Sequence, residues 1–175
     1  NQIQALLEDE TLPWHGELVV EVGDTSYSKP AYLHANRHHD NLVTVARVRS
    51  NRTFHHQFVY MDGERPAHHP RWYGAAFKLP DPTTWGEPDL ETRFTETSRR
   101  GKRYTIVIQG WQNMLMRGKH KPERIPMHRH PFTLIKITRY DEEGHLAFVR
   151  PLWLIVVGER RAGEADTDRV GAEDR

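Results

Sequence analysis

The sequence contains no cysteine, and this absence excludes both a disulfide framework and any metal site built on thiolates. A chain without cysteine suits a reducing compartment, so the cytoplasm is the expected location. Long apolar runs are also missing, because no stretch approaches the roughly 18 residues that a membrane-spanning helix needs. No charged segment followed by a short apolar core stands near Asn1. We therefore expect no address signal and no membrane partner.

A strong excess of one charge is absent too, since 25 basic residues nearly balance 24 acidic ones and leave a net charge of +1. The hydrophobic share of 37% supports one domain of modest core. The last stretch, 159–175, holds six acids and four arginines with little to bury, which predicts a disordered tail. The chain begins at Asn1 inside an amphipathic stretch, Gln2–Leu7, so we expect a helix already in progress and an internal piece of a longer protein.

The first third of the chain has the pattern of a strand, a helix and a second strand. Leu18–Val22 is short, apolar and rich in β-branched residues, which predicts a buried strand that ends in the polar turn 23–26. Pro30 favours a helix start, and this helix should run to about His39. Leu42–Arg49 is the second strand. Such a crossover predicts a parallel pair.

The parallel pair places Asp24 at the carboxyl end of a central strand. Ligands of open α/β sheets gather at this edge, where Arg47, Arg49 and Arg52 should also lie. A carboxylate in that position can hold a hard divalent cation. The alternative is that Asp24 closes a turn or caps the next helix, and composition by itself favours that alternative.

The rest of the chain is mostly β in character. Between Thr53 and Trp85 the pattern indicates loops and a short hairpin. Three strands are expected at Arg103–Trp111, Phe132–Thr138 and Leu152–Val157, with a hairpin-like turn at 141–145 leading into 146–149. The predicted fold class is therefore α/β, with a strand-helix-strand unit at 1–52, a β-rich insertion at 53–150 and a returning strand at 151–158.

Three stretches, 20–28, 41–52 and 150–154, resemble in order and spacing the middle of bacterial insertion-sequence transposases with a DDE endonuclease domain. The segment 81–89 resembles the acidic Trp-Pro segment of these enzymes, and Trp111 with Leu115 resembles the strand that follows it. The resemblance covers about Gly16 to Gly158.

This resemblance implies an RNase H-like core in which Asp24 is the second catalytic Asp and a Mg²⁺ ligand. It also implies a bacterial cytoplasmic enzyme that acts on DNA at transposon ends, with a homodimer as a further expectation for the intact enzyme. The first Asp and the Glu of the triad have no counterpart here, and Glu159 directly follows a strand, so we assign it no role. One carboxylate cannot hold two metal ions, so the chain alone should bind Mg²⁺ weakly and cleave nothing.

A basic segment is the second candidate site, because 97–130 contains nine basic residues against the single acid Glu123. These cations could follow a phosphate backbone, or they could form a solvated loop. Trp111 could stack on bases, although core packing is the commoner role of such a residue. The nine basic residues of the segment 97–130 are Arg99, Arg100, Lys102, Arg103, Arg117, Lys119, Lys121, Arg124 and Arg129. If Asp24 were only a turn residue, the chain would be a noncatalytic nucleic-acid-binding domain.

Histidine is the third candidate, since there are twelve, some of them adjacent in sequence. Neighbouring side chains on a strand point in different directions. The sequence also contains no His-Glu-x-x-His motif, which would place two imidazoles on one face of a helix. The sequence therefore argues against zinc. A metal-dependent hydrolase that uses His and Asp would need ligands brought together by the fold. The adjacent pairs are His38-His39, His55-His56 and His68-His69.

Overall fold

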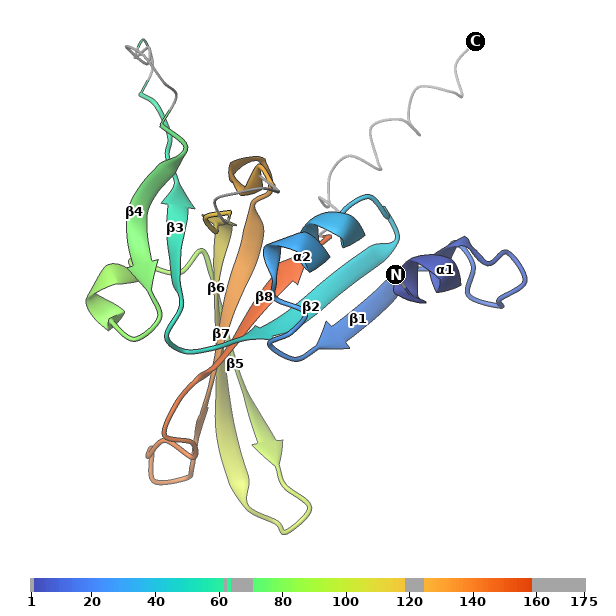
Figure 1. The fold of residues 1–175 in the computed structure, drawn as a ribbon. Coiled ribbons are helices and arrows are strands. Elements are labelled where there is room, and N and C mark those ends of the chain that lie inside the picture. The colour runs from blue at the N-terminus through green and yellow to red at the C-terminus, as the bar shows by residue number, and fades with distance from the viewer. Residues whose placement is uncertain (1, 62, 64–70, 119–124, 159–175) are drawn as a thin grey trace, which may run out of the picture.

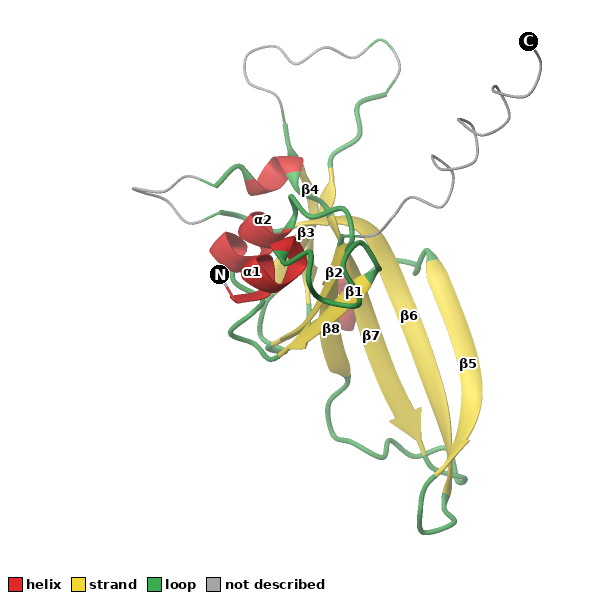
Figure 2. Ribbon diagram, turned by 90° about the vertical axis from the view of Figure 1, so that its right-hand side faces the viewer, coloured by secondary structure: helices red, strands yellow, loops and turns green. Residues whose placement is uncertain are grey.

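The computed structural model describes residues 2–61, 63, 71–118 and 125–158, which form one mixed eight-stranded sheet with two short α-helices (Figures 1 and 2). The strand order is β1-β2-β8-β7-β6-β3-β4, and β5 pairs with β6. The helices are α1 (Gln2–Glu8) and α2 (Pro30–Asn36), with 3-10 turns η1 (Pro82–Thr84) and η2 (Met127–Arg129). The strands are β1 (Val19–Gly23), β2 (Leu42–Val48), β3 (Thr53–Gln57), β4 (Tyr73–Lys78), β5 (Leu90–Thr97), β6 (Arg103–Leu115), β7 (Phe132–Tyr140) and β8 (Leu152–Val157).

The β1-α2-β2 unit has the predicted topology. β1 and β2 are parallel, with Val19 opposite Leu42 and Gly23 opposite Ala46, so the predicted pairing is confirmed. α2 starts at Pro30, whose fixed φ suits a first helical turn, but it ends at Asn36 rather than near His39. Among the described strands β1 pairs with β2 alone, so the expectation of a central strand for Asp24 is wrong. The six other strands add beyond β2, through its antiparallel contact with β8.

The second half of the chain is richer in strands than its sequence indicates. β3 and β4 form an antiparallel pair in the range where loops and a short hairpin were expected, and each contributes one fully buried ring, Phe54 and Phe77. β5 was missed altogether, because all eight of its residues are exposed and none follows a core alternation. β8 lies between β2 and β7, and so joins both halves in one sheet. The predicted α/β class holds at this level.

The core is built around an aromatic cluster assembled from distant segments. Trp111, Trp153 and Phe77 are at most 2% exposed, and Trp85 packs against them. The Trp111 and Trp153 ring centroids lie 5.8 Å apart, and Phe77 meets Trp111 edge-on at 5.1 Å. The hypothesis that Trp111 stacks on DNA bases is therefore wrong, because other rings already cover its faces.

The helices of the described part are short. None combines the length and the apolarity that crossing a membrane requires. The predicted tail, 159–175, lies outside the described residues.

Candidate functional site

Asp24 follows the last residue of β1 and lies exposed at the carboxyl end of the parallel pair. Its Oδ1 atom accepts a hydrogen bond from the backbone N–H of Ser26 at 2.7 Å, and its carbonyl accepts one from Tyr27 at 3.2 Å. Gly23 allows this turn to fold back tightly, since a Cβ there would lie 2.4 Å from Cγ of Tyr27. The turn role that the sequence kept as an alternative is thus real. It engages one carboxylate oxygen and leaves the side chain at the surface.

Glu21 is a second carboxylate of β1, which the sequence reasoning did not single out. It accepts hydrogen bonds from the hydroxyl of Tyr32, from Nδ2 of Asn36 at 3.0 Å and from Oγ1 of Thr44 at 3.3 Å. Its donors come from α2 and β2, so Glu21 fastens the helix onto the strand pair. The available signal was the charge of Glu21 inside the apolar run Leu18–Val22, because a carboxylate on such a strand needs hydrogen-bond partners.

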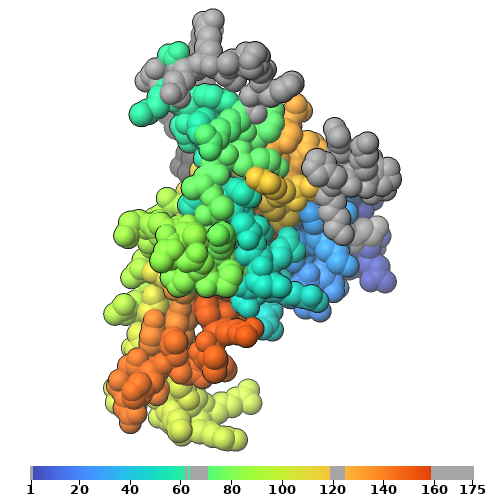
Figure 3. Space-filling model, turned by 60° about the vertical axis from the view of Figure 1, so that its left-hand side comes forward, coloured from blue at the N-terminus to red at the C-terminus, as the bar shows by residue number. Residues whose placement is uncertain are grey.

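Two predicted arginines and two unpredicted ones share a cleft of about 680 Å³ beside the Asp24 turn. Arg47 and Arg49 enter it from the end of β2, and Thr25, next to Asp24 in the chain, also lines it. Arg139 of β7 and Arg150, which precedes β8, line it as well. In Figure 3 the segment around 150 (orange) lies against the segment around 50 (cyan). β2 and β7 both pair with β8, and this pairing brings the four cations together.

Arg52 was grouped with Arg47 and Arg49, but it does not line the cleft. Its guanidinium lies 5.6 Å from the ring centroid of Phe54. Burial lowers the pKa of Arg52, and the nearby charge of Arg49 lowers it further. Like charges are therefore crowded at the end of β2.

The described cations of the basic segment 97–130 do not form one face. Its first four cations, Arg99, Arg100, Lys102 and Arg103, are exposed at the turn between β5 and β6 (Figure 1). Arg117 and Arg129 lie beyond the other end of β6, which is 13 residues long. The remaining cations, Lys119, Lys121 and Arg124, lie outside the described residues. The described cations of this segment therefore lie at two ends of β6, and one stretch of DNA backbone along a single face would not contact them all.

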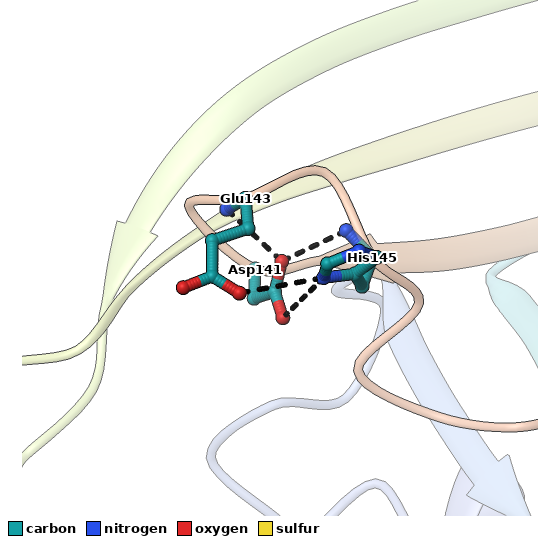
Figure 4. A group of neighbouring side chains, drawn as sticks. All are labelled: Asp141, Glu143 and His145. Atoms are coloured by element: carbon teal, nitrogen blue, oxygen red, sulfur yellow. Dashed lines mark hydrogen bonds and ion pairs between the residues drawn. The ribbon is translucent and has the colours of Figure 1, made fainter.

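A group of three side chains that could hold a metal ion exists, but it is not at Asp24. Asp141, Glu143 and His145 lie close together on the turn after β7 (Figure 4). Nδ1 of His145 is 3.4 Å from Glu143 and 3.8 Å from Asp141, while Oδ1 of Asp141 accepts the backbone N–H groups of residues 143 and 145. These contacts explain the predicted turn structurally. Within the described residues no such group includes Asp24, so the donors present there do not complete a Mg²⁺ shell.

The predicted histidine pairs do not form metal sites in the described part of the chain. His55 packs against Tyr73 and His56 against Phe77, so the two rings have different neighbours. A different set gathers instead, with the ring of His34 4.7 Å from His130 and 5.5 Å from His38. The pair His68-His69 lies outside the described residues.

The pKa of His130 is lowered to about 4, chiefly by burial and then by the charge of Arg37, with His34, His38 and His128 adding to the effect. The imidazole of His130 is therefore neutral near pH 7.

Comparison with protein families decides the identity of the domain. The family model described as DDE superfamily endonuclease matches residues 3–116, which is more than half of the 175 residues. The chain belongs to this family. The matched range contains the β1-α2-β2 unit, the Asp24 turn and β6. Comparisons with curated proteins and with solved structures found no match.

Membership in the DDE superfamily endonuclease family confirms the predicted resemblance at the level of a DDE-type transposase or endonuclease domain. Nucleases of this superfamily typically use divalent metal ions, and membership implies a DNA substrate.

Proposed function

We propose that this chain is part of a bacterial insertion-sequence transposase in which Asp24 supplies one of the three metal-binding carboxylates. The observation that carries the proposal is the position of Asp24 at the open carboxyl edge of a parallel strand pair within the family match. This edge is where open α/β sheets bind ligands. An RNase H-like core of 1–52 and 151–158, interrupted by a β-rich insertion of 53–150, accommodates the pairing of β2 with β8.

The proposal assigns no cleavage to this chain by itself. Two-metal phosphoryl transfer needs several carboxylates to hold both ions, and we assign only Asp24. Mg²⁺ binding should therefore be weak.

DNA contact is assigned to the cations at and near the Asp24 edge. Arg47 and Arg49 lie in the cleft, and the β5–β6 turn adds an exposed group of four. Arginine and lysine neutralise backbone phosphates without reading sequence, so this binding should be nonspecific and salt-dependent. Arg52, Lys119 and Lys121 stay in the proposal as further backbone contacts. Transposon ends as the target and a homodimer of the intact enzyme are also part of it.

The test measures metal binding and cleavage separately. Mn²⁺ is titrated into the 175-residue chain and followed by electron paramagnetic resonance, with Asp24→Asn as the variant and exposed Glu87→Gln as the matched control. Asn retains an oxygen for the Ser26 turn, so the fold should survive. We expect weak Mn²⁺ binding that Asp24→Asn reduces and Glu87→Gln does not, and no nicking of supercoiled DNA. Equal binding by all three proteins would contradict the assignment. Robust nicking abolished by Asp24→Ala would show that a complete carboxylate set lies within the chain.

A noncatalytic nucleic-acid-binding domain is the second candidate, and the hydrogen bond from Ser26 to Asp24 favours it. In that case Asp24 is only a turn residue. DNA binding that persists while Asp24→Asn leaves Mn²⁺ binding unchanged would support this candidate over the first.

A further inference from the structure

The lining of the cleft beside Asp24 has an unusual charge composition. Four arginines contribute to it, whereas no aspartate or glutamate does. Arginine stays protonated at every pH a protein tolerates, so this concave surface has a permanent positive charge. Thr25, Ser50 and Asn51 add uncharged hydrogen-bonding groups at the mouth. These groups together favour a ligand with several anionic oxygens.

Three of the four arginines are available to such a ligand. Within the described residues, Arg47, Arg49 and Arg150 are all exposed and none forms an ion pair with a carboxylate. Their forked guanidinium groups match the geometry of phosphate oxygens. Folding has therefore collected cations from β2 and from the start of β8 without neutralising them.

The fourth, Arg139, is held in place rather than free. Its guanidinium carbon lies 3.7 Å from the ring centroid of Tyr104 and its Nη2 atom 3.7 Å from Glu96, while its side chain is 24% exposed. Its Nε atom is buried and has no hydrogen-bond partner among the described residues. A stacked and ion-paired arginine loses little freedom on binding, so Arg139 offers a preorganised wall.

Further cations lie at the same end of the sheet as the cleft. β6 pairs Ile106 with Arg139 and starts at Arg103, which is ion-paired with Glu142 at 3.6 Å, while Arg99, Arg100 and Lys102 are exposed on the β5–β6 turn. At the other side, Thr25 connects the cleft directly to Asp24. Several cations that lie near Asp24, the proposed metal ligand, suit a ligand with a chain of phosphates better than a single anion.

We propose that this cleft binds the phosphodiester backbone of one DNA strand, with Arg49 and Arg150 contacting phosphates and with Arg139 of β7, on the far side of β8 from β2, lining the cleft beside them. The cleft then holds the strand next to Asp24. The inference rests on the proposed function only in assigning the strand to the DNA that the intact enzyme cuts.

The test compares two double variants that remove the same charge from different places. Arg49→Gln with Arg150→Gln empties the cleft of two cations, whereas Arg71→Gln with Lys78→Gln removes two exposed cations at and before β4, at the opposite edge of the sheet from β1. Binding of a fluorescein-labelled 20-nucleotide DNA strand is followed by anisotropy over a range of salt concentrations.

We expect the cleft double variant to weaken binding by about tenfold and to reduce the slope of log K against log salt by about 1.4, from about 0.7 per lost contact on single strands. The β4 double variant should change both by much less. Equal losses in the two double variants would overturn the cleft assignment, because general charge would then explain the binding. Absence of binding to the wild-type chain at low salt would overturn it as well.

Two further measurements distinguish a DNA strand from free phosphate, and a failure of the cleft assignment from a failure of the proposed function. Displacement of the strand by millimolar inorganic phosphate at constant ionic strength would identify a free-phosphate site and contradict the strand. Mn²⁺ titration of the cleft double variant should match wild type, since Asp24 is intact. If wild type binds the strand through the cleft but Asp24 holds no Mn²⁺, the proposed function fails and the cleft assignment stands. If Asp24 binds Mn²⁺ and the cleft variant binds DNA normally, only the cleft assignment fails.

Discussion

The two ends of the sheet differ in the kind of cation that they collect. One end, which we call the arginine end, is where β1 and β2 finish and β6 begins, and it contains the cleft arginines and the β5–β6 turn (Figure 1). The other, the histidine end, is where β6 finishes and β7 begins, and it gathers His34, His38, His128 and His130 in addition to Arg37, Arg117 and Arg129. Both ends are joined by β6 and β7, which pair along most of their length.

What distinguishes the histidine end is charge that depends on pH. Arginine is protonated at all accessible pH values, so the arginine end can attract a polyanion under any condition. Burial lowers the pKa of His128 and of His130, so these two imidazoles are neutral near pH 7 and gain charge only in acid, beside the permanent charges of Arg37 and Arg129. We therefore expect DNA binding to belong to the first end and the pH dependence of stability to belong to the second.

The largest effect should come from the core that links the two ends. Trp111→Ala removes a ring that is 2% exposed and in contact with Phe77, Trp85 and Trp153. Such truncations cost about 3–5 kcal/mol, so we expect the free energy of unfolding to fall by that amount in urea titrations.

Trp111→Phe is the matched control, because it keeps an aromatic ring in the cluster and should cost less. DNA affinity measured at low temperature, where the variants remain folded, should equal that of wild type. A Trp111→Phe protein that is stable but binds DNA many-fold more weakly would restore the stacking role that the structure excludes.

Charge reversal at the β5–β6 turn should produce the next largest effect. Replacing Arg99, Arg100, Lys102 and Arg103 with Glu should remove most sequence-independent duplex binding, because the exposed turn adds cations at the same end of the sheet as the cleft. If all four contact phosphates, the salt slope should fall in magnitude by about 3.6, from about 0.9 per contact. Anisotropy titrations at several salt concentrations measure this slope. An unchanged slope would return the turn to the role of a solvated loop.

The smallest effect should appear at the histidine end as a pH dependence of stability. His130 has a pKa of about 4 in the folded chain against an ordinary value of 6.5, so the unfolded state binds its proton first as the pH falls. Its contribution to stability is present above pH 6.5 and is lost progressively down to about pH 4. The groups that face it are Arg37, His34, His38 and His128.

Thermal unfolding across that pH window tests the prediction. His130→Gln should flatten the fall in Tm between pH 6.5 and pH 4, whereas replacement of exposed His15 by Gln should leave the fall unchanged. DNA affinity at constant ionic strength should vary little between pH 7 and pH 8 in all three proteins. A strong loss of DNA binding in His130→Gln at pH 7 would remove the distinction between the two ends.

The sequence predicted the β1-α2-β2 unit because its signals are local. A short β-branched run, a proline at a helix start and a second apolar run are each readable within about ten residues, and together they place Asp24. The edge position of β1 was not predictable in that way. It depends on where β8 pairs, more than 100 residues later in the chain.

The cleft arginines show the same limit of prediction from local sequence more clearly. Arg47 and Arg49 were candidates because they end a predicted strand, but Arg139 and Arg150 join them only through the β2-β8-β7 pairing. Conversely, the basic segment 97–130 is continuous in sequence and yet split by the length of β6. Trp111 was misassigned for a related reason, because its charged sequence neighbours gave no indication of the distant Trp153 and Phe77.

The most direct test of the central claim, that DNA lies along the Asp24 edge, uses the absence of cysteine from the chain. A single cysteine in place of exposed Ser26 or exposed His38 gives one attachment point at the arginine end or at the histidine end. Each protein is labelled with the same photoactivatable crosslinker and irradiated with labelled duplex DNA. The account predicts efficient crosslinking from position 26 and little from position 38. Crosslinking from position 38 that equals or exceeds that from position 26 would contradict it.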